Sequence, residues 1–161
     1  MTTQEREAGS VAAIASFVRW TIECMEAIPY WFIALIARVP IAVVFWYSGR
    51  TKVDGWNVFQ VNENALLLFE NEFQVPLLTP VLAAHLAALA EHIFPVMLVL
   101  GLATRYAALA LLIMTAVIQL FVYPDAWPTH GTWAACFLIL IARGPGAVSL
   151  DHLIARRFGP S

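Results

Sequence analysis

The sequence predicts an all-α integral membrane protein: a four-helix bundle with interfacial amphipathic helices at both ends. Hydrophobic residues make up 61% of the 161-residue chain and charged residues 12%, which is about half the charge of an average soluble domain. Four stretches approach the roughly 20 apolar residues that cross a bilayer. The segments that flank these stretches have the spacing of amphipathic surface helices.

Residues 1–29 are predicted to form a cytoplasmic helix lying on the membrane surface. Apolar side chains recur at helical spacing from Val11 to Met25, whereas Arg19 and Glu23 fall elsewhere on the helix. This separation of apolar and polar faces is typical of a helix that rests on a bilayer.

The transmembrane domain is predicted over residues 30–143. Its four spans cover about 30–48, 77–103, 106–123 and 129–143. The second span contains Pro80 and Pro95, and because each proline removes a backbone hydrogen bond, we expect a tilt or a kink there. The fourth span is the shortest, so it is expected to use its flanking residues or to thin the bilayer.

Loop 49–76 is predicted to face outward, with a helix over Asn64–Phe73 packed on the mouth of the bundle. At the opposite end, Gly144-Pro145-Gly146 should end the fourth span. Residues 144–161 should then form a cytoplasmic interfacial segment in which Ser149 caps a short helix. The basic end of that helix is expected to lie against anionic lipid.

The distribution of basic residues predicts the topology. One side of the spans is flanked by Arg6, Arg19, Arg105, Arg143, Arg156 and Arg157. The other side has only Arg50 and Lys52. Since cytoplasmic flanks carry the positive excess, both termini of this multi-pass protein are predicted to be cytoplasmic.

Composition and motifs exclude several functions. Nine Lys and Arg against eleven Asp and Glu leave no basic surplus for nucleic acid. Gly-rich phosphate loops, G-x-S-x-G and H-E-x-x-H do not occur, so nucleotide hydrolysis and metalloprotease chemistry have no support. Cys24 and Cys136 are predicted on opposite sides of the membrane, which argues against thiol exchange by this chain alone.

Two ionisable side chains lie near the middle of predicted spans, where charge is costly. Arg38 and Glu91 are at equal depth in consecutive antiparallel spans, which predicts an ion pair between them. The pair has two interpretations. It is a clamp that fixes the register of the helices, or it forms the floor of a cavity in which the guanidinium holds a carboxylate, a quinone oxygen or a haem propionate.

The histidines supply a second group of candidates. His85 and His92 share one helix face but lie about 10 Å apart along the axis, too far to share one metal ion. At least one of them is expected to contact a ligand, a cofactor or a proton path. Gln119, Tyr123 and His130 belong to the same outward half of the bundle, which favours a convergent polar site there. A simpler alternative makes His130 a helix cap or an interfacial residue.

Five motifs follow one another along the chain: Arg38-Val39-Pro40-Ile41-Ala42, Gly49-Arg50-Thr51-Lys52, Ala90-Glu91-His92-Ile93-Phe94-Pro95, Gly101-Leu102-Ala103-Thr104-Arg105 and Gly144-Pro145-Gly146-Ala147-Val148-Ser149-Leu150-Asp151. Together they resemble the DoxX family of small bacterial membrane proteins, over about residues 37–151. The resemblance implies a four-helix subunit of the bacterial inner membrane. It also implies redox work, as in thiosulfate:quinone oxidoreductase, or oxidative-stress complexes with partner proteins.

His85, His92 and Pro128-Thr129-His130 resemble one subgroup of that family. This subgroup is found in gene clusters with small metal-handling peptides and their modifying enzymes. The resemblance therefore implies copper or other metal stress.

The leading hypothesis is a redox subunit of an oxidoreductase that binds a quinone-like or haem-like cofactor in a polar cavity and exchanges electrons with a partner protein. The candidate catalytic residues are Arg38, Glu91 and His92. The candidate cofactor-binding residues are Arg38, His85, His92, Gln119 and Tyr123.

Two alternatives belong to other classes. One is a membrane copper-binding protein without turnover, in which His85 and His130 are the ligands. The other is a scaffold that holds partner proteins through its acidic and aromatic outer loop and its cytoplasmic helix. The sequence leaves self-association open.

Overall fold

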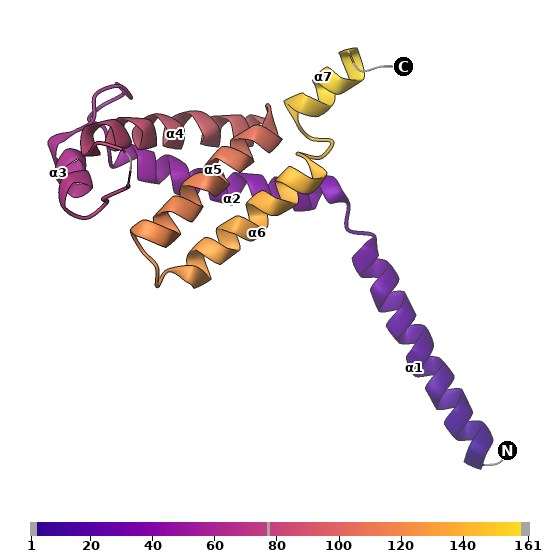
Figure 1. The fold of residues 1–161 in the computed structure, drawn as a ribbon. Coiled ribbons are helices and arrows are strands. Elements are labelled where there is room, and N and C mark those ends of the chain that lie inside the picture. Colours follow the sequence, from indigo (N-terminus) through magenta and orange to yellow (C-terminus); the bar gives the residue numbers. More distant parts are fainter. Residues whose placement is uncertain (1–2, 77, 159–161) are drawn as a thin grey trace.

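The computed structural model describes residues 3–76 and 78–158, which form an all-helical bundle (Figure 1). The predicted fold class is confirmed. The helices are α1 (Thr3–Glu26), α2 (Tyr30–Arg50), α3 (Glu63–Asn71), α4 (Pro80–Leu100), α5 (Thr104–Phe121), α6 (Trp127–Arg143) and α7 (Leu150–Phe158). Between α2 and α3, an isolated antiparallel bridge joins Val53 to Val61.

Within the described residues, three helices are long and apolar enough to cross a membrane: α2, α4 and α5. Helix α6 has 17 residues, about 26 Å at 1.5 Å per residue, which is slightly less than the thickness of a typical hydrocarbon core. Its role as the fourth span stays a prediction.

Helix α4 is shorter than the predicted span. Pro80 is its first residue, and Thr79 accepts a hydrogen bond from the backbone N–H of Leu82 at 3.4 Å. Proline suits this position because the first helical N–H needs no partner within the helix. Pro80 therefore begins α4 without breaking a hydrogen bond of the helix, whereas Pro95 lies inside α4. The expected tilt or kink stays a prediction. Gly101, with a left-handed φ of 67°, ends the helix.

The four long helices of the bundle form two pairs, α2 with α4 and α5 with α6. In Figure 1 the pairs lie close together near α7 and diverge toward α3. The main core fills the narrow part and consists of Ala34, Ala37, Ile41, Ala42, Phe45, Leu98, Ala107, Ala108, Leu111, Phe137 and Leu140.

Helices α2 and α4 are offset along their axes. Gly49, at the end of α2, packs against Glu91 and His92 near the middle of α4, whereas Gly101 at the end of α4 packs against Arg38. The first turns of each helix therefore extend beyond the end of the other. We call these two extensions overhangs, and other segments of the chain must pack against each of them.

The two overhangs are covered by different segments. The first turns of α4 are covered by α3, which lies where the sequence predicts an outer helix and packs Ala65 and Phe69 against alanines of α4. The first turns of α2 are covered by the chain that follows α6, where Gly146 packs against Trp31 and Ala34.

The end segments also agree with the predicted elements. Ser149 caps α7 as predicted, because its hydroxyl accepts a hydrogen bond from the backbone N–H of His152 at 3.1 Å. Helix α1 projects away from the bundle (Figure 1). The placement of α1 on a membrane surface stays a prediction.

Candidate functional site

A cavity of about 480 Å³ lies between the two helix pairs at the α3 end of the bundle. Most of its lining side chains are apolar and come from α2, α3, α4, α5 and α6. Its polar lining residues are Ser48, Lys52, Glu91, Tyr123 and His130. Concave, mainly apolar sites with a few polar groups are typical of small-molecule binding.

A buried ion pair forms one polar part of the wall. Lys52 Nζ donates to Glu91 Oε2 at 2.6 Å, and the two side chains are 7% and 3% exposed. Ser48 Oγ accepts from Lys52 Nζ at 3.0 Å and donates to Glu91 Oε1 at 3.3 Å. Because each charge has a partner, the pair can persist in an apolar protein interior.

The sequence around the end of α2 explains how this pair forms. Ser48 and Lys52 are four residues apart, which places both side chains on the same side of a helical turn. Gly49 between them has no side chain, and a Cβ there would lie 2.9 Å from the His92 imidazole and 3.0 Å from Glu91 Cβ. The glycine therefore allows α4 to approach until Glu91 reaches Lys52.

A second polar group lies on the side of α5 and α6. The distance from His130 Nδ1 to Gln119 Oε1 is 2.7 Å, and Gln119 Nε2 donates to the carbonyl of Pro124 at 2.5 Å. The Pro124 carbonyl fixes the orientation of the amide, so the amide oxygen faces the imidazole. Nδ1 of His130 must then carry a hydrogen, which leaves Nε2 of the neutral ring as a proton acceptor.

The predicted ion pair between Arg38 and Glu91 does not form. Arg38 instead donates from Nη2 to the carbonyl of Val148 at 2.7 Å and lies against Gly101. Gly101 and Glu91 are ten residues apart on α4, about 15 Å along the axis. The prediction assumed equal depth from the span centres, and the offset of α2 against α4 removes that equality. Arg38 is not among the residues that line the cavity.

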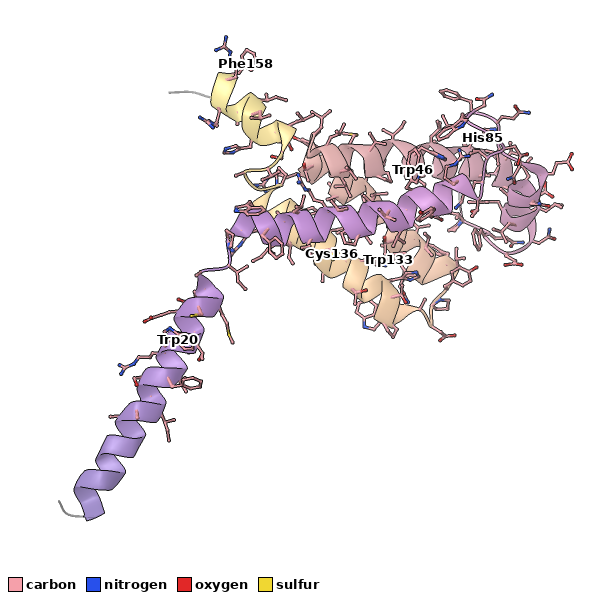
Figure 2. All side chains as sticks on the ribbon, turned by 180° about the vertical axis from the view of Figure 1, so that it is seen from behind. Trp20, Trp46, His85, Trp133, Cys136 and Phe158 are labelled. Atoms are coloured by element: carbon pink, nitrogen blue, oxygen red, sulfur yellow. The ribbon has the colours of Figure 1, made fainter. Side chains whose placement is uncertain are left out.

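The histidines of α4 do not line the cavity either. Nδ1 of His85 is 2.8 Å from the carbonyl of Val81, and Nδ1 of His92 is 2.7 Å from that of Ala88. In Figure 2, His85 and Trp133, a cavity residue of α6, lie on opposite sides of α2. His92 is buried against Trp46 at a ring-centroid distance of 5.1 Å, and its Nε2 has no hydrogen-bond partner in the described structure.

The structure does not bring the predicted metal ligands together. His130 lines the cavity and His85 does not. Across residues 12–76 and 78–158, whose side chains the structure describes, no three His, Cys, Asp or Glu side chains form a group that could hold a metal ion.

The sequence analysis used Lys52 as a flanking charge and as part of the Gly49-Arg50-Thr51-Lys52 motif, but it named neither Lys52 nor Ser48 as a site residue. The available signal was their spacing of four residues at the end of an apolar span, directly beside a glycine. Tyr123, Glu91 and His130, which the sequence did single out, do line the cavity. Gln119 contributes through its contact with His130.

Comparison with known proteins adds the family. The profile of the DoxX family matches residues 33–124. The chain belongs to the DoxX family. A Haemophilus influenzae protein described as uncharacterized is 31% identical over 130 residues, which is 76% of this chain and 83% of the relative. No solved structure matches the chain.

The DoxX match covers the ion pair of the site but only part of the second polar group, because it includes Gln119 and not His130. Residues 33–124 span most of α2 and all of α3, α4 and α5, so they include Ser48, Lys52 and Glu91. His130 lies on α6, beyond the matched region. The ion pair therefore belongs to the part of this chain that defines its family, whereas the histidine comes from the segment that follows.

Proposed function

We propose that this DoxX protein is a redox subunit of the bacterial inner membrane that binds a quinone-like molecule in the cavity and exchanges electrons with a partner protein. The observation that carries the proposal is the cavity of about 480 Å³. The apolar walls of the cavity suit the ring and the apolar tail of a quinone. The two polar groups, Lys52 with Glu91 and His130 with Gln119, suit the oxygen atoms of the ring.

The polar groups fit such a ligand in number and chemistry. Lys52 directs N–H donors to Glu91 and to Ser48 Oγ, and its contact with the Ser48 carbonyl is longer, at 3.3 Å. That third N–H is the one most easily taken over by a ligand oxygen. Nε2 of His130 accepts a hydrogen bond, which suits the hydroxyl of a reduced ring.

A bound quinone would supply two-electron, two-proton chemistry, with electrons passing to or from the partner protein. The residues of this chain handle the protons. Glu91 can hold a proton at a carboxylate oxygen and His130 at Nε2, while Lys52 favours the charged carboxylate when no proton is held. The apolar walls exclude bulk water from this exchange.

A quinone-like ligand is favoured over haem by the positions of the histidines. A haem iron takes an axial imidazole. His85 and His92, which were predicted to supply it, are not among the cavity-lining residues, and this leaves His130 alone for that role. Metal handling by His85 and His130 has the same difficulty, because the two imidazoles do not share a cavity.

The proposal also orients the protein, with both termini cytoplasmic and the α3 end of the bundle outward, as the distribution of basic residues favours. Cys24 on α1 is exposed and free. A membrane-impermeant maleimide should therefore label Cys24 in inverted membrane vesicles and not in intact spheroplasts. Labelling of Cys24 in spheroplasts would contradict this orientation.

The decisive experiment is purification from native membranes in mild detergent, followed by an optical spectrum and organic extraction. We expect co-purifying quinone, and saturable binding of a decyl-tailed benzoquinone to the emptied protein. The variant Lys52→Met with Glu91→Gln, which removes both charges together, should bind at least about tenfold more weakly. The matched control is Arg50→Met at the same end of α2, because Arg50 does not line the cavity. A folded protein that binds no quinone would overturn the proposal.

A further inference from the structure

Aromatic side chains close the cavity on the side where α2 faces α6. Phe45 is 2% exposed and packs against Trp133 at a centroid distance of 5.2 Å and against Phe137 at 5.7 Å. Phe45 and Trp133 both line the cavity. A ligand cannot pass between these helices without separating these packed rings.

A second aromatic row lines the end of the cavity under α3. Phe69 packs against Phe73 at 5.3 Å, and Phe73 packs against Tyr123 at 5.5 Å. All three side chains line the cavity. This row joins α3 to the end of α5 and narrows the cavity at that end, where Tyr123 is 47% exposed.

The side between α4 and α5 is different. Leu86 on α4 and Ile113 on α5 both line the cavity, yet they are 48% and 58% exposed. Their neighbours in the wall are the small side chains Ala83, Ala87, Ala90 and Ala110. The cavity is therefore continuous with the outer surface through this lateral opening, defined by Leu86 and Ile113. Both helices are long and apolar enough to cross a membrane, so the opening faces hydrocarbon.

We infer that the ligand is a lipid-soluble molecule that reaches the cavity from the bilayer through the lateral opening and carries a long apolar tail. The inference rests on the proposed function, because it places the polar ring at Lys52 and Glu91. The tail then lies between Leu86 and Ile113 and continues into the lipid. The tail covers the apolar surface at the opening when the ligand is bound, and lipid covers it when the ligand is absent. This surface is therefore not exposed to water in either case.

The test compares two ligands and two matched variants in detergent micelles. The ligands are one benzoquinone ring with a decyl tail and the same ring with a methyl group in its place. Leu86→Trp should obstruct the opening. Its control is Ile93→Trp, because Ile93 lies seven residues further along the same face of α4, is 51% exposed and does not line the cavity. Ile113→Trp obstructs the opening from the other helix.

We expect Leu86→Trp and Ile113→Trp to slow association of the decyl-tailed ring at least about fivefold relative to Ile93→Trp, with a smaller effect on the methyl ring. Equal rates in all three variants for both rings would overturn lateral access while leaving quinone binding intact. Failure of either ring to bind the folded wild-type protein would instead overturn the proposed function, and the inference with it. Circular dichroism and elution profiles establish that each variant is folded.

Discussion

The two ends of the bundle each bury a cation, in different surroundings. At the α3 end, Lys52 pairs with a carboxylate and lines a cavity. At the α7 end, Arg38 is 1% exposed and donates to the carbonyl of Val148, while Nε and Nη1 have no hydrogen-bond partner in the described structure. Both are costly charges in an apolar interior. The difference is that Lys52 reaches the cavity in which we propose that the ligand binds, whereas Arg38 lies outside it and contributes to packing.

Around Arg38, several hydrogen bonds join the chain that follows α6 to the rest of the bundle. We call this set of contacts, made by Tyr30, Arg38 and Asp151, the latch. Tyr30 donates from its hydroxyl to the carbonyl of Gly144 at 2.7 Å. Asp151 accepts from the backbone N–H groups of Ala103 at 2.7 Å and Thr104 at 2.9 Å. These contacts tie the chain after α6 to the starts of α2 and α5. Arg38 adds one more contact to the same segment.

The largest expected effect separates the two cations. Lys52→Met leaves Glu91 buried without its countercharge, so it should destabilise the protein by about 3–5 kcal/mol. Arg38→Met removes a donor to a backbone carbonyl and leaves no carboxylate in direct contact without a cation, so it should cost less, about 1.5–3 kcal/mol. Reversible unfolding in mixed micelles measures both values.

The double variant sharpens the interpretation of the first result. Adding Glu91→Gln to Lys52→Met removes the isolated charge, so most of the lost stability should return. If the double variant is as unstable as Lys52→Met alone, the ion pair does not explain the loss. If Arg38→Met loses more stability than Lys52→Met, then the buried cation at the α7 end matters more for stability than the ion pair at the α3 end, contrary to the expectation.

Gly101→Ala should have the next largest effect, about 2–4 kcal/mol. Gly101 has φ +67°, and an added Cβ would lie 2.2 Å from Arg38 Nη1 and 2.4 Å from Ser149 Cβ, so backbone strain and overpacking add together. Gly55→Ala is the matched control, because Gly55 has φ +66° and open space around it. Its cost should be about 1 kcal/mol. Equal losses of stability in the two variants would show that the latch tolerates the extra carbon.

The fold was largely predictable, because each helix has a strong local signal. Apolar runs identified the long helices, and Ser149 marked the start of α7. The lengths of the spans did not reveal how far α2 is offset from α4, since packing at Gly49 and Gly101 fixes that offset.

The site was predictable only in part, for the same reason. Glu91 was identified as an ionisable residue near the middle of a span, and Tyr123 and His130 as polar residues of the outward half of the bundle, and all three line the cavity. The partner of Glu91 depends on the helix offset, so an argument from equal depth predicted Arg38, whereas the partner in the structure is Lys52. The packing of α5 decides which face of α4 borders the cavity, and the sequence does not reveal that packing. His85 and His92 lie on another face of α4 and are therefore outside the site.

A smaller effect is expected at the cap of α5. Asp151→Ala removes the acceptor for two backbone N–H groups, and one of these belongs to Ala103, whose φ of 44° is left-handed. The loss should be about 1–2 kcal/mol, as for other helix caps. Asp54→Ala, an exposed carboxylate in the loop after α2, should change stability by less than about 0.5 kcal/mol. A latch that holds the α7 end requires the Asp151 variant to lose more.

The smallest effect on stability is expected for a substitution of Gln119. Its effect on ligand binding distinguishes the α3 end of the bundle from the α7 end most directly. Gln119→Leu removes the acceptor that holds the Nδ1 hydrogen of His130, so the imidazole can turn and its Nε2 loses a fixed direction. Binding of the decyl-tailed benzoquinone should weaken about threefold to tenfold, while stability changes by less than about 1 kcal/mol. Asp151→Ala should show the opposite pattern, with lower stability and unchanged binding. If both variants weaken binding equally, the α7 end is coupled to the cavity, and the separation of a ligand-binding end from a structural end does not hold.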